Sequence, residues 1–173
     1  MNYIHPTAII YPGVKLGDNI FIGAYSVIGA PPEHPEEVDP RKERDGYSVM
    51  IGDNVTIREH VTVNAGITEF TWIDTGAYLM CHSHVGHDAS IGENCVLHSG
   101  AVVGGFSRVM KYARIGLNAS VHQWSVIEEG SMIGAQSFFK GVMDMKKMYR
   151  VWVGLPAKDI GPNQRLLDKL NKK

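Results

Sequence analysis

The chain has 173 residues and a nearly balanced charge, with 17 basic and 18 acidic side chains. This length suits one domain with its own core, and the charge balance excludes an extended basic surface for nucleic acid or an anionic membrane. No run of about eighteen apolar residues is present, so we expect no membrane span. The only cysteines, Cys81 and Cys95, fall on outward and inward positions of the repeat described next. That placement argues against a disulfide and for a cytoplasmic location.

A six-residue repeat organises most of the chain. An aliphatic residue returns every six positions, and from Ile73 onward a small residue follows four positions after it each time. A helix would need a period of about 3.6 residues and a flat strand a period of about 2, so this period predicts the stacked coils of a β-helix. The aliphatic positions are Ile4, Ile10, Leu16, Ile22, Ile28, Ile51, Ile57, Val63, Ile73, Leu79, Val85, Ile91, Leu97, Val103, Val109, Ile115, Val121, Ile127 and Ile133.

We therefore predict an all-β fold, a left-handed parallel β-helix over residues 1–153 with three hexads in each coil of a triangular prism. The left hand follows other hexapeptide prisms and runs against the usual crossover rule. We expect residues 154–173 to form a C-terminal capping tail, with a short helix over Asn163–Lys172, because the coils bury their interiors only against neighbours and their ends need covering.

Two segments interrupt the repeat. Residues 30–50 are rich in proline and charge and must protrude as a loop, which is either plain solvated surface or a substrate contact. The second interruption, Glu69–Trp72, is short and carries aromatic residues. We expect those aromatic side chains to pack against a neighbouring subunit.

Histidines concentrate on one part of the prism. Because three hexads make one coil, residues eighteen positions apart share a face, which places His87 beneath Gly105 and Gln123. The neighbouring column holds Gly86, Gly104 and His122. The glycines leave a trough beside the imidazole, with the Gly105 backbone N–H about 4.8 Å away, one coil spacing.

This arrangement suits acyl transfer. A histidine can take the proton of an attacking hydroxyl, and a backbone N–H can stabilise the oxyanion that forms on the thioester. Asp88, next in sequence to His87, can orient the ring. No serine or cysteine nucleophile is required, so we predict direct transfer with His87 as general base, Asp88 as its support and Gly105 as oxyanion donor.

Two other functions fit the same residues. His82, His84 and His87 are dense enough for zinc, and carbonic anhydrases of the gamma class use such a prism. Their pattern has a histidine thirty-six residues before a His-x4-His pair, but Gly46 and Ile51 stand at those positions before His82 and His87. We therefore expect no metal site. The remaining alternative is a non-catalytic hexapeptide-repeat scaffold, in which loss of a histidine has no effect.

Several motifs resemble one known family. The segments 51–66, 79–97, 101–105 and 119–123, with an Ile-Arg-Glu motif at 57–59 and a His-x-x-His-Asp motif at 84–88, resemble the bacterial UDP-N-acetylglucosamine O-acyltransferases of lipid A synthesis. The resemblance covers nearly the whole chain. It implies a homotrimer with active sites between subunits, a sugar nucleotide as acceptor, and an acyl-carrier-protein or coenzyme A thioester as co-substrate, with no bound cofactor.

The resemblance also assigns residues. His87 and Asp88 fall on the family's catalytic base and its support, and Gly105 on its oxyanion-hole glycine. We further assign to substrate binding the residues that match the family's substrate contacts or stack beside the base: His84, His122, Gln123, Asn163 and Lys169.

Departures from the family pattern leave the substrates open. Phe106 replaces an active-site histidine, and Lys169 stands where arginine is usual. Ala135 and Phe138 are bulkier than the residues that shape a long acyl channel, so we predict a shorter acyl pocket. Residues 153–160 also resemble sugar acetyltransferases that use acetyl-CoA. The acyl length, the donor, the sugar, and O- or N-acylation therefore stay undetermined at this stage.

Overall fold

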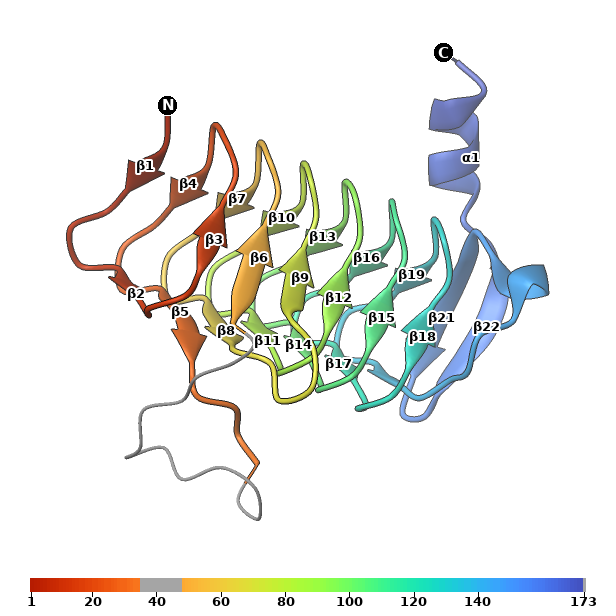
Figure 1. The fold of residues 1–173 in the computed structure, drawn as a ribbon. Coiled ribbons are helices and arrows are strands. Elements are labelled where there is room, and N and C mark those ends of the chain that lie inside the picture. The colour runs from red at the N-terminus through yellow and green to blue at the C-terminus, as the bar shows by residue number, and fades with distance from the viewer. Residues whose placement is uncertain (35–47, 173) are drawn as a thin grey trace.

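The computed structural model describes residues 1–34 and 48–172, which form a triangular prism of three parallel sheets, a left-handed β-helix (Figure 1). Each coil contributes one short strand to each sheet, and successive coils stack along the prism axis. The predicted fold class is confirmed.

We call the three sheets A, B and C, and successive strands along the chain belong to them in that order. Sheet A contains β1 (Tyr3–Ile4), β4 (Phe21–Ile22), β7 (Thr56–Ile57), β10 (Tyr78–Leu79), β13 (Val96–Leu97), β16 (Arg114–Ile115), β19 (Met132–Ile133), β21 (Arg150–Gly154) and β22 (Ala157–Pro162). Sheet B contains β2 (Ile9–Ile10), β5 (Val27–Ala30), β8 (Thr62–Asn64), β11 (His84–Val85), β14 (Val102–Val103), β17 (Ser120–Val121) and β20 (Phe138–Phe139). Sheet C contains β3 (Lys15–Leu16), β6 (Val49–Ile51), β9 (Thr71–Ile73), β12 (Ser90–Ile91), β15 (Arg108–Val109) and β18 (Val126–Ile127).

The register between coils is constant where the repeat is unbroken. Leu79 pairs with Leu97, and Leu97 pairs with Ile115, so each partner lies eighteen residues further along. Each strand inside a sheet bonds to the strands of the coils before and after it. Residues eighteen positions apart therefore form a column along the prism, and the position of one member sets the positions of the others. This constancy lets the sequence spacing predict which side chains share a corner.

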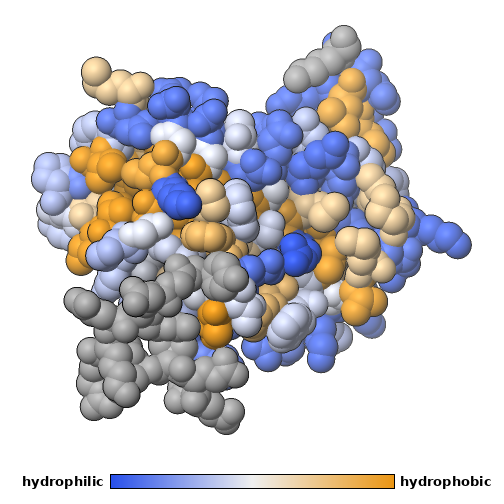
Figure 2. Space-filling view, viewed as in Figure 1, coloured by the Kyte–Doolittle hydropathy of each residue, from blue (hydrophilic) through white to orange (hydrophobic). Residues whose placement is uncertain are grey.

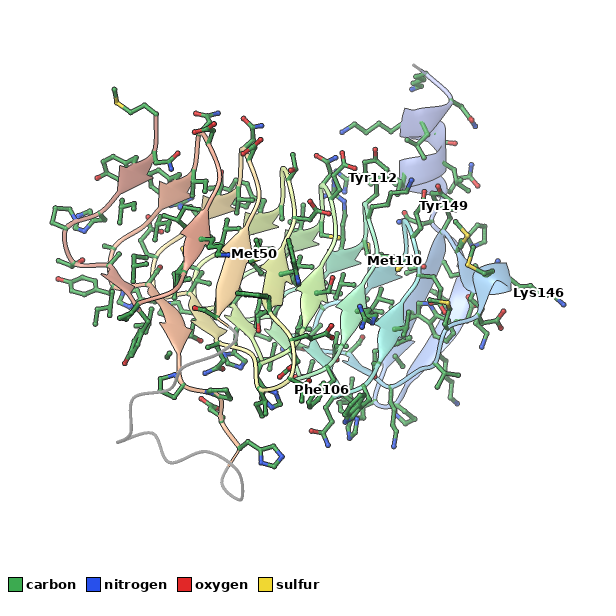
Figure 3. The ribbon with its side chains drawn as sticks, in the orientation of Figure 1. Met50, Phe106, Met110, Tyr112, Lys146 and Tyr149 are labelled. Atoms are coloured by element: carbon green, nitrogen blue, oxygen red, sulfur yellow. The ribbon has the colours of Figure 1, made fainter. Side chains whose placement is uncertain are left out.

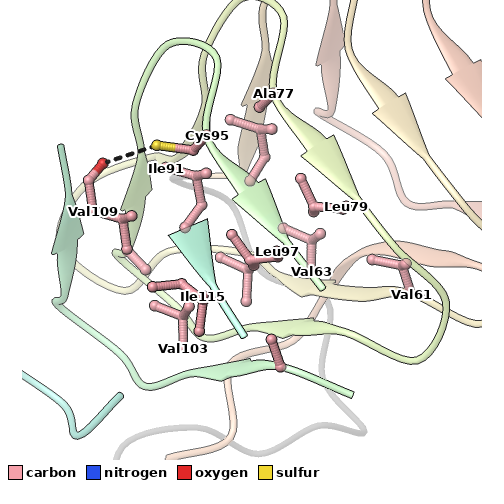
Figure 4. Close-up of a cluster of buried hydrophobic side chains, with 14 of the residues drawn as sticks. Val61, Val63, Ala77, Leu79, Ile91, Cys95, Leu97, Val103, Val109 and Ile115 are labelled. Carbon is pink, nitrogen blue, oxygen red and sulfur yellow. Dashed lines mark hydrogen bonds between the residues drawn. The ribbon is translucent and has the colours of Figure 1, made fainter. Parts of the chain in front are cut away.

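The repeat positions fill the prism interior (Figure 4). Leu79, Val85 and Leu97 are completely buried, and the small residues Ser83 and Cys95 occupy the corners where the coils bend. Cys81 is half-buried and Cys95 is buried, and both are free thiols. At the first coil Ile4 remains 40% exposed, because no further coil in the structure covers it.

The two interruptions lie where the repeat breaks. The first separates β5 from β6, and residues 35–47 of the predicted 30–50 loop lie outside the described residues, so its proposed substrate contact is not addressed there. The second, Glu69–Trp72, follows β8, and its last two residues already belong to β9. Figure 2 shows apolar side chains gathered toward the N-terminal coils on the face that sheet C presents.

The C-terminal segment continues the fold in two ways. After the 3-10 helix Met145–Lys147, strands β21 and β22 form an antiparallel hairpin at the end of sheet A. Helix α1 (Gln164–Leu170) follows, shorter than the expected 163–172, with the Asn163 side chain accepting the Leu166 N–H at its start. No helix in the described residues is long and apolar enough to cross a membrane. The capping role of residues 154–173 stays a prediction.

Candidate active site

The turns that link sheet B to sheet C, at 86–89, 104–107 and 122–125, form one edge of the prism, which we call the B–C corner. Each turn holds one residue with left-handed backbone: Asp88 at φ 56°, Phe106 at 58° and Trp124 at 62°. Aspartate tolerates this region, whereas bulky aromatic residues rarely adopt it. The repeated conformation makes Asp88, Phe106 and Trp124 a column, with His87 immediately before Asp88.

His87 and Asp88 form a buried pair. The His87 Nδ1 lies 2.9 Å from Asp88 Oδ2, and the aspartate side chain is fully inaccessible. An ionised carboxylate can only accept hydrogen bonds, so Nδ1 carries the ring proton and donates it to Asp88. The neutral ring therefore keeps the lone pair on Nε2.

Asp88 is held in its ionised form. Burial by itself would raise its pKa, but backbone N–H groups of Ile67 and Glu69, then His87 and the Thr68 N–H, act against burial. The net pKa of Asp88 is below its usual value, because these donors stabilise the carboxylate more than burial destabilises it.

The free nitrogen of His87 faces a glycine one coil away. A Cβ added at Gly105 would lie 2.8 Å from both Cε1 and Nε2 of His87, so only glycine fits there without displacing the ring. A Cβ at Gly86 would lie 2.7 Å from the Gly105 nitrogen. The Gly105 N–H has no acceptor among residues 1–34 and 48–172. The structure thus brings His87, Asp88 and Gly105 together, with a base and an unused N–H donor side by side.

Two further histidines lie next to this group. His84 Nδ1 is 2.8 Å from Thr62 Oγ1, and burial lowers the pKa of His84 while the charge of Glu33 partly opposes that shift. His122 Nδ1 is 2.8 Å from the Gln123 carbonyl oxygen, and its ring meets Phe138 edge-on at 5.9 Å between ring centroids. Gln123 itself is exposed. Both histidines offer polar groups beside the corner that holds His87.

Aromatic rings replace polar groups on one side of the base. Phe106, placed at the lower corner in Figure 3, meets His87 edge-on at 5.0 Å and stacks on Trp124 at 3.9 Å with an interplanar angle of 6°. Trp124 is 64% exposed. The departure from the family histidine at 106 therefore gives the site an apolar wall.

Asn163 and Lys169 lie elsewhere in the chain. Asn163 is buried at the start of α1, where its Nδ2 donates to the Gly130 carbonyl at 2.8 Å. Lys169 lines an open groove of about 310 Å³ with Asn94, Tyr112, Arg114, Leu166 and Leu170. Figure 3 shows Tyr112 beside α1 and Phe106 at the opposite corner. Within one chain, these two predicted substrate contacts are not brought to His87.

The predicted acyl-pocket residues divide by orientation. Phe139 points inward, is 3% exposed and packs edge-on against Trp152 at 5.2 Å. Phe138 is half-buried on the outer face of sheet B beside His122, whereas Ala135 is exposed at another corner. Of the two phenylalanines, Phe138 is therefore the one that can border a ligand near His122.

Sequence reasoning missed two neighbours of the base. His34 meets His87 at 6.0 Å between ring centroids with an interplanar angle of 73°, and its buried Nδ1 has no hydrogen-bond partner among residues 1–34 and 48–172. The turn at 67–69 supplies the donors that surround Asp88. His34 lies in the first interruption and the 67–69 turn lies at the start of the second, where spacing carries little positional information.

The zinc alternative is not favoured by the geometry. His82 is exposed at the corner between sheets A and B, where it stacks on His60 at 4.8 Å, so the His-x4-His pair is divided between two corners. Within the described part of the chain, no three histidine, cysteine or acidic side chains are grouped as metal ligands.

Comparisons with known proteins agree with the fold and the motifs. The family model for the bacterial transferase hexapeptide (six repeats) matches residues 1–30 and 70–105. Acyl-[acyl-carrier-protein]–UDP-N-acetylglucosamine O-acyltransferases are 34% identical over 94 residues in Campylobacter concisus and 35% identical over 130 residues in Campylobacter lari. These matches cover 53% and 54% of this chain, but 34% and 49% of the two relatives. The chain thus spans about half the length, or less, of these curated relatives.

Solved structures show the same fold. The UDP-N-acetylglucosamine acyltransferase of Campylobacter jejuni superposes with a TM-score of 0.72 at 24% identity, covering 98% of this chain and 82% of that one. PerB of Caulobacter crescentus, in complex with CoA and GDP-perosamine, gives a TM-score of 0.63 at 22% identity over 92% of this chain and 57% of its own. The chain therefore carries hexapeptide repeats and is similar to the UDP-N-acetylglucosamine O-acyltransferases in fold and, over about half of its length, in sequence.

Proposed function

We propose that the protein is an acyltransferase that moves an acyl group from an acyl-carrier-protein or coenzyme A thioester directly to a hydroxyl or amine of a sugar nucleotide. One observation carries the proposal: the free Nε2 of His87 lies against Gly105, while Nδ1 is fixed by Asp88. A general base and an oxyanion donor are thereby separated by no more than one coil of the prism.

The chemistry follows from these positions. His87 Nε2 takes the proton from the acceptor hydroxyl or amine, whose oxygen or nitrogen attacks the thioester carbonyl carbon. The oxyanion that forms accepts the N–H of Gly105. When the tetrahedral intermediate collapses, the carbon–sulfur bond breaks and the leaving thiolate receives the proton from His87 as a thiol. Asp88 stays ionised throughout and stabilises the transient imidazolium.

The neighbouring residues suit an acceptor with several hydroxyls. The lowered pKa of His84 keeps that ring neutral near physiological pH, so it can both donate and accept a hydrogen bond. His122 and Gln123 offer further polar atoms one coil beyond Gly105. The relatives' names specify UDP-N-acetylglucosamine and acyl-carrier-protein, and the PerB complex holds CoA with another sugar nucleotide. A cytoplasmic role in lipid A or other cell-surface saccharide synthesis is part of the same proposal.

We also propose a homotrimer with the active sites between subunits. Asn163 and Lys169 can serve as nucleotide contacts only from a neighbouring chain, because within one chain they lie beside α1 at another corner. Trp72 and Trp124, 44% and 64% exposed, supply apolar surface for such contacts.

The test is thiol release from a panel of thioesters, from acetyl-CoA to long-chain acyl-carrier-protein, combined with UDP-, dTDP- and GDP-sugars. With the thioester and sugar nucleotide that react, His87→Ala should lower kcat about 10²–10⁴-fold, the usual contribution of a positioned base. His82→Ala is the matched control, because it removes an exposed imidazole from another corner. Activity above about a tenth of wild type in His87→Ala would contradict the assignment, and no thiol release from any pair would favour the scaffold alternative.

A further inference from the structure

The connection from β8 to β9 lies against the carboxylate of Asp88. Val63 and Ile73 are separated by ten positions instead of six, and this longer connection bends at 67–69, at the junction between the hexad of Val63 and the second interruption. Asp88 Oδ2 accepts the Ile67 N–H at 2.8 Å. Its Oδ1 accepts three donors: the Thr68 N–H at 2.7 Å, the Thr68 hydroxyl at 2.8 Å and the Glu69 N–H at 2.8 Å.

These bonds leave the carboxylate no alternative orientation. Oδ1 is occupied by the turn, and Oδ2 is shared between Ile67 and the His87 Nδ1. Rotation of the carboxylate would break charge-assisted hydrogen bonds in a site closed to water, where they are strong. The direction of Oδ2 therefore determines where the His87 ring points and which of its nitrogens carries the proton.

A turn that only needed attachment to the prism would not require this arrangement. Thr68 is exposed at the surface, yet both its backbone and its hydroxyl bond to the buried Asp88. The Glu69 side chain instead pairs with Arg108 at 3.2 Å on the outside, so it is separable from the carboxylate. The donors of the turn thus contact Asp88, which contacts His87, whereas the Glu69–Arg108 ion pair contacts neither residue.

We propose that the 67–69 turn is a positioning element for catalysis, in which Thr68 acts through Asp88 to hold His87 in the tautomer and orientation of a general base. This rests on the proposed function. Thr68→Val removes the hydroxyl donor and keeps the side-chain shape, and Thr68→Ser restores the hydroxyl. Arg108→Gln is the control, because it breaks the outer ion pair of the turn and has no contact with Asp88. Thr68→Ala removes the same hydroxyl should Thr68→Val fold poorly.

Two readouts separate positioning from mere attachment. We expect Thr68→Val to lower kcat about tenfold with little change in KM, because a misplacement of about 1 Å costs roughly 10²-fold and the loss of one of four donors should displace the ring by less. Thr68→Ser and Arg108→Gln should stay near wild type. Nitrogen NMR of His87 should show the Nδ1–H tautomer in wild type and a mixture in Thr68→Val, with Asp88→Asn as the reference for an unheld ring.

The NMR readout requires no substrate, so it tests the positioning even if no acyl transfer is found. If Thr68→Val keeps both the His87 tautomer and the kcat of wild type, the proposal is overturned and the turn is an anchor only. Equal losses in Thr68→Val and Thr68→Ser would also overturn it, because the hydroxyl would then not be the operative group.

Discussion

Gly105→Ala is the sharpest perturbation of the site, because it adds one methyl group against the reactive edge of His87. The new Cβ would lie 2.8 Å from Cε1 and Nε2 of the ring and 3.1 Å from the His87 carbonyl oxygen. Gly105 does not use left-handed backbone, so alanine brings no φ strain of its own. The effect of the substitution should therefore come from the contact with His87.

The geometry sets the size of the effect. Ordinary contact begins at 3.4 Å, so the ring must retreat about 0.6 Å or turn on its bond to Asp88. A misplacement of about 1 Å costs roughly 10²-fold in rate, and we expect a loss of kcat of about 30- to 100-fold. Overpacking a fitted site costs about 1–3 kcal/mol, so the free energy of unfolding should fall by that amount.

The assay combines kinetics with a double-mutant cycle on stability. Thiol release measures kcat, and urea unfolding is followed for wild type, Gly105→Ala, His87→Ala and the double mutant. Without the imidazole the two contacts at 2.8 Å are gone and the backbone oxygen at 3.1 Å remains, so Gly105→Ala should cost less than half as much stability in the His87→Ala background. Equal costs in both backgrounds, or a Gly105→Ala enzyme with more than half of the wild-type kcat, would refute the placement of His87.

Three more predictions concern other parts of the chain. Burial raises the pKa of Glu128, whose Oε2 has no partner within the described residues, so its charge costs stability above the folded pKa. This cost declines as the pH falls through the folded pKa and is gone below the unfolded pKa, so Glu128→Gln should stabilise by about 1 kcal/mol in urea unfolding near pH 7, with the gain vanishing in acid. Phe138→Ala should move the preference of kcat/KM toward longer acyl thioesters, and an unchanged chain-length profile would remove Phe138 from the pocket. Light scattering should give three times the 19.1 kDa chain mass and a lower mass for Trp72→Glu, whereas a wild-type monomer would contradict the trimer.

Much of the fold follows from the period alone. A six-residue repeat makes three strands per coil, and parallel pairing carries each column through the prism with a constant eighteen-residue step. That is why the neighbourhood of His87 and Gly105 could be predicted from spacing. Phe139 continues the aliphatic series from Ile133 and points inward for the same reason.

Irregular segments have no period from which their contacts can be read. His34 lies beside His87, and Thr68 bonds to Asp88, because the chain in and next to the two interruptions folds back onto the B–C corner. Likewise Asn163 matches a family substrate contact in sequence, but the structure uses its amide to start α1 at a different corner. The sequence alone thus determined the scaffold and the columns on it, because a repeated backbone hydrogen-bond ladder propagates position. The tertiary structure decided which irregular segments surround those columns, because such contacts depend on where single loops return.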